Sequence, residues 1–137
     1  MVCIYCSGCT EVTNSRHQKK HNNIWRRRLC QVCGATFTSR EFPDLTASTI
    51  VVGEDPSTLT PFYREKLFVS ILQACGHREQ PIVDATALTQ TIVAKIPFSS
   101  EGSVSRDALV RAASEVLARF DSAAATHYAA YHPLATS

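Results

Sequence analysis

Two Cys-x-x-Cys pairs in the first third of the chain constrain its fold more than any other feature. Cys3 and Cys6 form the first pair, and Cys30 and Cys33 form the second. The pairs are separated by roughly 20 residues, a spacing typical of a four-cysteine zinc site. Thiolates in this pattern can occupy adjacent corners of a Zn²⁺ tetrahedron, with each pair on a tight turn. These four cysteines are therefore the predicted ligands of one structural zinc ion.

A third cysteine complicates the first pair, because Cys6-x-x-Cys9 has the same spacing. We favour Cys3 with Cys6, since such a turn usually ends in a small residue that lets backbone amides approach the sulfur. Ser7-Gly8 and Gly34 follow the two pairs in the required places. Cys9 is then predicted to be a plain thiol.

Other readings of these side chains remain open at the level of sequence. Cys75 is also predicted to be a plain thiol, and the four paired cysteines could themselves be buried or redox thiols. His17 and His21 could be ligands, but two cysteine pairs already complete a tetrahedron. Both histidines are therefore predicted to be solvated loop residues.

Charge and length divide the chain into two modules. Its 137 residues suit one domain or two small ones. Residues 1–45 hold seven Lys/Arg and three Asp/Glu, a charge of +4, whereas residues 46–137 hold seven and nine, a charge of −2. This asymmetry predicts a basic, polyanion-binding module in residues 1–45 and a different one in residues 46–137. A segment as short as the first buries too little apolar surface to fold alone, so zinc would supply folding free energy.

The first module is predicted to be a zinc ribbon, a small antiparallel β-structure. The segment 16–23 would be its polar loop, and Trp25 with Phe37 would form its apolar core. A Trp25 that faces a base or sugar is the alternative. The three short strands are expected at residues 11–13, 24–29 and 35–38.

The basic residues of this ribbon predict a nucleic-acid interface. The run Arg26-Arg27-Arg28 alternates faces along a strand, so at least one face is basic. Such clusters gain affinity by displacing counterions from phosphates, and Arg can read guanine bidentately. A solvated charged face is the alternative, and sequence does not separate DNA from RNA. The predicted contacts are Arg16, Lys19, Lys20, Arg26, Arg27, Arg28 and Arg40.

The second module is predicted to be mainly helical with a short β-hairpin, which makes the whole chain α+β. Residues 41–49 are predicted to be a linker and residues 53–57 a turn.

The helices contain no paired carboxylates or Ser/His/Asp set, so an enzyme is not expected. Lys66 and Arg64 in a first helical turn are unusual, since a helix N-terminus favours anions and cations there can face a phosphate. The expected elements are a strand at 49–52, a helix capped by Thr60 that runs to about Ala74, a second helix that follows Pro81 and bears Ile82, Ala85, Thr89, Ile92 and Ile96, a third capped by Ser103 or Ser105, and a fourth capped by Asp121.

Localisation follows from what the sequence lacks. There is no apolar run of about 18 residues, so no transmembrane helix is expected. The first 30 residues lack the layout of a signal peptide, which predicts a cytoplasmic protein. Cysteines in that compartment are metal ligands or free thiols more often than disulfides.

The order of these features resembles the NrdR family of bacterial transcriptional repressors, an N-terminal zinc ribbon followed by an ATP-cone. The resemblance covers about residues 1–132, and the ribbon with its arginine run is its most specific part. The motifs that carry it are Cys3-x-x-Cys6, Arg26-Arg27-Arg28-x-Cys30-x-x-Cys33, Phe37-Thr38-Ser39-Arg40-Glu41, Pro61-Phe62-x-x-Glu65-Lys66-Leu67, Ala74-Cys75, Leu117-x-x-Phe120-Asp121, Tyr128 and Tyr131.

The resemblance implies a cytoplasmic homo-oligomer that binds one zinc ion and paired operator boxes upstream of ribonucleotide reductase genes. Its cone would bind ATP or dATP, and the ligand would change oligomeric state and hence DNA affinity. Lys66 carries over as a nucleotide contact. Val51, Val52, Phe62 and Leu67 carry over as pocket walls, with a core role as the alternative for Phe62 and Leu67.

Departures from the family pattern make the cone divergent. The strand and turn at 50–55 contain no Lys or Arg, Leu59-Thr60 replaces an Arg-Glu pair, and His127 and His132 stand at arginine positions. Two hypotheses follow. One is a zinc-dependent repressor of ribonucleotide reductase genes that ATP or dATP modulates. The other is a nucleotide-independent zinc-ribbon module that docks on protein or RNA.

Overall fold

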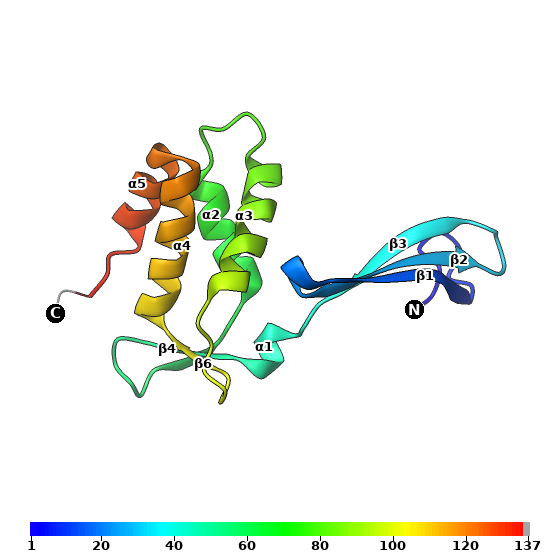
Figure 1. Cartoon of the computed structure of the whole chain (residues 1–137), viewed down its shortest axis with the longest axis horizontal. Helices are drawn as coiled ribbons and strands as arrows, with labels where there is room; N and C mark the ends of the chain where they lie inside the picture. Colours follow the sequence, from blue (N-terminus) through cyan, green and yellow to red (C-terminus); the bar gives the residue numbers. More distant parts are fainter. Residues whose placement is uncertain (136–137) are drawn as a thin grey trace. The chain divides into compact units, whose positions relative to one another are not determined.

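The structure, a computed structural model, describes residues 1–135 and divides into two compact units (Figure 1). The first unit is Met1–Pro43, and the second begins at Asp44. The first holds an antiparallel sheet with the four paired cysteines clustered together, and the second holds the long helices. The predicted α+β class, with a small β ribbon before a mainly helical region, is confirmed.

The first unit is a three-stranded antiparallel sheet in the order β1-β2-β3. A short 3₁₀ turn, η1 (Lys19–His21), joins the first two strands, and Asn22 ends it in the left-handed conformation with φ 47°. The strands are β1 (Thr10–Gln18), β2 (Asn23–Cys30) and β3 (Thr36–Glu41).

The first strand is much longer than the sequence indicated. The segment 16–23 was predicted as a loop, but β1 extends to Gln18 and pairs along its length with β2. Arg16 lies opposite Trp25, and Gln18 lies opposite Asn23. Polar residues are poor strand formers by propensity, but continued backbone pairing outweighs that weak preference in a sheet with solvated faces. His17 is therefore an exposed strand residue and not a loop residue.

The sheet has no shared core between Trp25 and Phe37, contrary to prediction. Residues directly opposite each other on paired strands share a face. Phe37 lies opposite Arg28, three positions from Trp25 along β2, so the two aromatic side chains are on opposite faces. Both are half-buried. A single sheet without a covering layer cannot bury both faces, which makes the cysteine cluster more important to the fold.

The second unit places one short helix and four longer helices beside a small sheet in the order β5-β4-β6, and Figure 1 shows β4 and β6 at one end of the longer helices. The strand pair β4–β5 is antiparallel, and β4–β6 is parallel. The strands are β4 (Ile50–Val52), β5 (Leu59–Pro61) and β6 (Ser103–Ser105). The helices are α1 (Leu45–Ser48), α2 (Arg64–Ala74), α3 (Pro81–Lys95), α4 (Arg106–Phe120) and α5 (Ser122–Tyr131).

Three of the predicted helix starts are confirmed, two of them by side-chain caps. Pro81 is the first residue of α3, where its missing N–H leaves no donor unpaired. Ser105 Oγ accepts the Ala108 N–H at 3.1 Å at the start of α4. Asp121 Oδ1 accepts the Ala124 N–H at 2.9 Å at the start of α5.

The predicted start of α2 is wrong, and the segment before it is a strand. Thr60 and Pro61 were expected to begin a helix, but both belong to β5, and α2 begins at Arg64. Strand β5 lies at the edge of its sheet, a position that tolerates proline. The predicted linker 41–49 also contains a helical turn, α1, capped by Asp44.

Strand β6 was not anticipated, because its parallel partner is about 50 residues away along the chain and only tertiary packing reveals it.

The core of the second unit is apolar and continuous across α2 to α5. Its fully buried side chains include Ile71, Ile92, Ala113, Leu117 and Ala124. They recur at helical spacing on the inward faces, as the sequence predicted for these helices. This core fixes α2 and α4 relative to β4, the elements that surround the cavity described below.

Asp121, which caps α5, is expected to make the stability of the second unit depend on pH under acidic conditions. The Ala124 N–H, His77 and Arg78 lower the pKa of Asp121 to about 2. Because this pKa lies below its usual value, the ionised carboxylate adds stability above about pH 4, and this stability is lost as pH falls toward about 2. We expect the thermal midpoint of the second unit, followed by far-UV circular dichroism, to drop over that range. Asp121→Asn keeps a capping oxygen without the charge, so its midpoint should depend less on pH. An equal dependence in both proteins would contradict this role.

Candidate metal centre and nucleic-acid interface

The four paired cysteines converge at one end of the sheet. The Sγ atoms of Cys3, Cys6, Cys30 and Cys33 all lie within 4.8 Å of one another. Cys3 Sγ and Cys33 Sγ are 3.7 Å apart, and Cys6 Sγ and Cys30 Sγ are 3.5 Å apart. A tetrahedral ion with Zn–S bonds of about 2.3 Å has sulfur–sulfur edges of roughly 3.8 Å, so these separations fit zinc.

Backbone amides around the sulfurs support a charged cluster. The Tyr5 N–H donates to Cys3 Sγ at 3.4 Å, and the N–H groups of Val32 and Cys33 donate to Cys30 Sγ at the same distance. Each turn closes through a left-handed residue, Ser7 with φ 59° and Gly34 with φ 73°. The expectation that small residues end the two turns is thus met.

The cluster titrates unevenly because four thiols share one site. The N–H of Cys33 lowers the pKa of Cys30 to about 6, and the Val32 N–H and the neighbouring thiol of Cys6 act in the same direction. The Gly8 amide lowers the pKa of Cys6, but the neighbouring thiols together raise it to about 12. One thiol therefore ionises readily, whereas complete ionisation calls for a bound cation to offset the accumulated charge.

The donor set, the spacing and the turns all fit one structural zinc ion, which would crosslink the two turns. Cys9 is exposed and lies outside the four-sulfur cluster, as does the buried Cys75. Among the described residues, neither His17 nor His21 joins a group that could hold a metal.

The strand register gathers three of the predicted DNA contacts on one face of the sheet. Arg16 and Arg40 lie opposite Trp25, and Arg27 is two positions further along β2. The Arg16 guanidinium carbon is 5.9 Å from the Trp25 ring centroid, a cation–π distance. We call this set of four side chains the Trp25 face. Its three arginines are exposed.

Acidic groups do not neutralise the Trp25 face. Within the strands, Glu11 is the one carboxylate in register with it, and Glu11 Oε2 accepts a hydrogen bond from Gln31 at 3.3 Å. Arg40 donates to the neutral side chain of Gln18 at 3.2 Å. Among residues 1–135, neither Arg16 nor Arg27 makes an ion pair.

The remaining predicted arginines lie on the opposite face and have local partners. Arg26 forms an ion pair with Glu41 at 3.0 Å. Arg28 Nε donates to Ser39 Oγ at 2.9 Å. Side chains alternate between the two faces along β2. Of the three arginines in the run, only Arg27 therefore lies on the Trp25 face.

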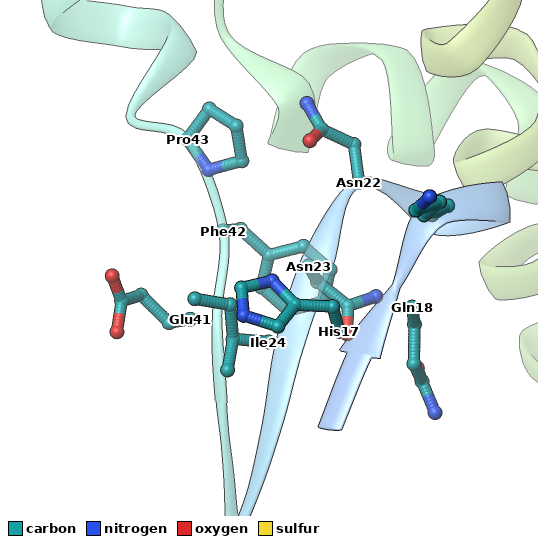
Figure 2. Close-up of a pocket in the computed structure, with 9 residues that line it drawn as sticks. His17, Gln18, Asn22, Asn23, Ile24, Glu41, Phe42 and Pro43 are labelled. Carbon is teal, nitrogen blue, oxygen red and sulfur yellow. The ribbon is translucent and has the colours of Figure 1, made fainter. Parts of the chain in front are cut away.

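The hairpin end of the ribbon carries the other two predicted basic contacts. Lys19 and Lys20 occupy η1 and are exposed. A hollow of about 350 Å³ lies beside them, and Figure 2 shows several of the side chains that line it. Its lining includes His17, Asn23 and Glu41, and of the predicted contacts only Lys19 takes part. This hollow is therefore distinct from the Trp25 face.

The second unit contains a cavity of about 360 Å³ between its small sheet and its helices. Four of the five predicted nucleotide-binding residues line it: Val51, Phe62, Lys66 and Leu67. The fifth, Val52, is in β4 but is not among the lining residues. Phe62 and Leu67 are also deeply buried in the core, so their core and pocket roles coincide. The volume lies within the range of small-ligand sites.

The predicted nucleotide-binding set did not include Arg106, Tyr128 or His132, which are among the polar residues that line this cavity. The rings of Tyr128 and His132 are stacked, with centroids 4.4 Å apart. Burial raises the pKa of Tyr128 to about 12, and burial together with Arg106 lowers the pKa of His132. Both side chains are therefore uncharged near neutral pH, and the cations of the cavity are Lys66 and Arg106.

Arg106 could not have been found by a local motif. It is the first residue of α4 and reaches the cavity only because α4 starts beside β4. His132 did leave a signal, since it stands where the resembling family has arginine.

Among residues 1–135, no helix is long and apolar enough to cross a lipid bilayer.

A three-stranded ribbon with a four-cysteine cluster, followed by a helical unit, defines a zinc-ribbon protein. A family model described as "Transcriptional repressor NrdR-like, N-terminal domain" matches residues 1–41. Over more of the chain, the protein is 34% identical to the transcriptional repressor NrdR of Anaplasma phagocytophilum, covering 80% of this chain and 67% of that one. It is 33% identical to the NrdR of Sphingopyxis alaskensis, covering 96% and 84%, and 30% identical to that of Symbiobacterium thermophilum, covering 96% and 87%. The chain belongs to the NrdR family.

Proposed function

We propose that this protein is a zinc-dependent transcriptional repressor that acts in the cytoplasm on double-stranded DNA. Residues 1–45 would be its DNA-binding domain and residues 46–137 its regulatory, ATP-cone-like domain. Its target genes would be those of ribonucleotide reductase. The family relatives, all named as transcriptional repressors, support the general role.

The observation that carries this proposal is the charge of the Trp25 face. Its three arginines are exposed and have no carboxylate partner within residues 1–135, on a sheet that a zinc ion would hold rigid. Uncompensated cations on a rigid surface can displace counterions from phosphates without first breaking ion pairs. Trp25 adds an apolar surface among them that can pack against a sugar or base. Lys19 and Lys20 at the hairpin end would add phosphate contacts.

The cavity of the second unit supports a regulatory role for ATP or dATP. It combines two cations, Lys66 and Arg106, with the stacked rings of Tyr128 and His132. Cations suit phosphates and flat rings suit a base or ribose. In this proposal nucleotide binding shifts the protein between homo-oligomers that do and do not match the operator spacing.

Footprinting on the organism's own ribonucleotide reductase promoters tests the proposal. We expect the zinc-loaded protein to protect a paired site, and dATP or ATP to change the extent of protection. A scrambled promoter of the same length is the control for non-specific binding. Equal affinity for both fragments would rule out operator recognition.

A second function is favoured by the composition of β4. Its sequence Ile50–Val52 and the following Gly53-Glu54-Asp55 offer no cation to a phosphate. The chain would then be a nucleotide-independent zinc-ribbon module that docks on protein or RNA. Calorimetric titration with ATP and dATP separates the two functions, because absence of heat and of thermal stabilisation at millimolar ligand would leave only the second.

A further inference from the structure

Arg106 connects the cavity of the second unit to an acidic residue outside it. Its side chain lines the cavity, and Nη1 contacts Glu54 Oε1 at 2.8 Å. Glu54 follows β4, in the connection to β5. A second carboxylate, Asp107, has its Oδ1 3.8 Å from the same nitrogen. One of the two cations of the cavity is therefore paired with a carboxylate in this structure.

The other cation has no such partner among residues 1–135. Lys66 projects from α2, and its Nζ lies 5.2 Å from the centroid of the Tyr63 ring. An anion in the cavity would thus meet one available cation and one that Glu54 occupies. The state of Arg106 decides whether the cavity offers one positive charge or two.

We infer that Arg106 is a phosphate-binding residue of this cavity and that Glu54 is a built-in competitor, which a bound phosphate group must displace. The inference rests on the proposed function, in which the cavity takes a nucleotide. It adds a binding residue and an autoinhibitory contact that belong to this chain's own sequence. Arg106 has two states, paired with Glu54 when the cavity is empty and bound to phosphate when it is filled.

The geometry makes this exchange physically reasonable. The Glu54 side chain is 65% exposed, and exposed ion pairs are weak because water screens them. A phosphate inside the cavity can accept two charge-assisted hydrogen bonds from one guanidinium, which is a stronger interaction. Displacing Glu54 from Arg106 therefore costs little compared with what a phosphate can gain.

Asp107 gives Arg106 a second anchor when Glu54 leaves. Its Oδ1 atom is buried and has no hydrogen-bond partner within the described chain. A buried carboxylate oxygen without a partner is unfavourable, and the nearby guanidinium is the group placed to relieve it. Release from Glu54 would leave Arg106 held at the cavity rather than free in solvent.

Affinity for ATP in the full-length, zinc-loaded protein tests the inference. By removing the competing charge, Glu54→Gln should bind ATP about three- to tenfold more tightly. Arg106→Gln should bind ATP at least about tenfold more weakly. The affinity of Arg106→Lys should fall between those of Arg106→Gln and wild type, because lysine keeps the charge but lacks the planar guanidinium that donates two hydrogen bonds to one phosphate. Arg111→Gln is the matched control, since Arg111 is an exposed cation of the same helix that does not line the cavity.

Adenosine, which has no phosphate, distinguishes electrostatic competition from a change in pocket shape. Its affinity should be the same in wild type and Glu54→Gln. Thermal unfolding of each variant confirms that it is folded. If wild type binds ATP and Glu54→Gln binds no more tightly, the ion pair between Glu54 and Arg106 has only a structural role and the inference is overturned. If neither wild type nor Glu54→Gln binds ATP, the nucleotide function fails as well. Binding by Glu54→Gln alone would support the inference directly.

Discussion

Replacing Cys30 by serine is expected to unfold residues 1–43, to abolish DNA binding and to leave the helical second unit folded. Cys30 is 1% exposed and accepts two backbone N–H groups, which places its sulfur firmly in the cluster. The serine hydroxyl stays protonated near neutral pH and cannot replace a thiolate as a zinc ligand. The sheet has no shared aromatic core to compensate. Structural zinc contributes on the order of 10 kcal/mol in zinc-finger peptides, which is comparable with the entire stability of a small domain. A chelator should produce the same result.

The measurement follows the two units separately in one protein. Fluorescence of Trp25, the only tryptophan of the chain, reports on the sheet, and far-UV circular dichroism reports mainly on the helices. Cys9→Ser is the matched control, because Cys9 is exposed and outside the four-sulfur cluster. Equal loss in Cys9→Ser and Cys30→Ser would show that the ligand set is different.

Arg27→Ala is expected to weaken operator binding about tenfold and to reduce the slope of log affinity against log salt by about one. The reason is that Arg27 is exposed on the Trp25 face and makes no ion pair with the described residues, so its replacement reduces by one the counterions released on binding. The effect should be similar on specific and non-specific DNA if Arg27 contacts phosphate. It should be larger on the operator if Arg27 reads a base edge.

Arg28→Ala is the control for this prediction, because it removes the same charge from the adjacent residue on the opposite face. Arg28 donates to Ser39, so its loss affects the sheet rather than the proposed DNA surface. We expect a clearly smaller change in salt slope, with both variants matched for zinc content and melting temperature. Equal slopes in the two variants would mean that net charge alone governs binding, and the Trp25 face would lose its role.

The zinc cluster and the helix starts were predictable because their causes are local in sequence. Two Cys-x-x-Cys turns define the ligand set before any tertiary structure exists, and Ser105 and Asp121 cap helices through atoms three residues away. The start of α2 was not predictable in this way. Pro61 is compatible with both a helix N-terminus and an edge strand, and pairing with β4 decided between them.

The sequence by itself determined that the chain would have a basic ribbon with a four-cysteine metal site, four helices with apolar faces and a strand at 50–52 without cations. Residue spacing is sufficient for these features, because turns, caps and helical faces depend on neighbours along the chain. Only the tertiary structure decided which arginines share the Trp25 face, that β6 completes the second sheet, and that Arg106 lies between the cavity and Glu54. These depend on strand register and on contacts between residues about 50 positions apart, such as Glu54 and Arg106, which no local pattern encodes.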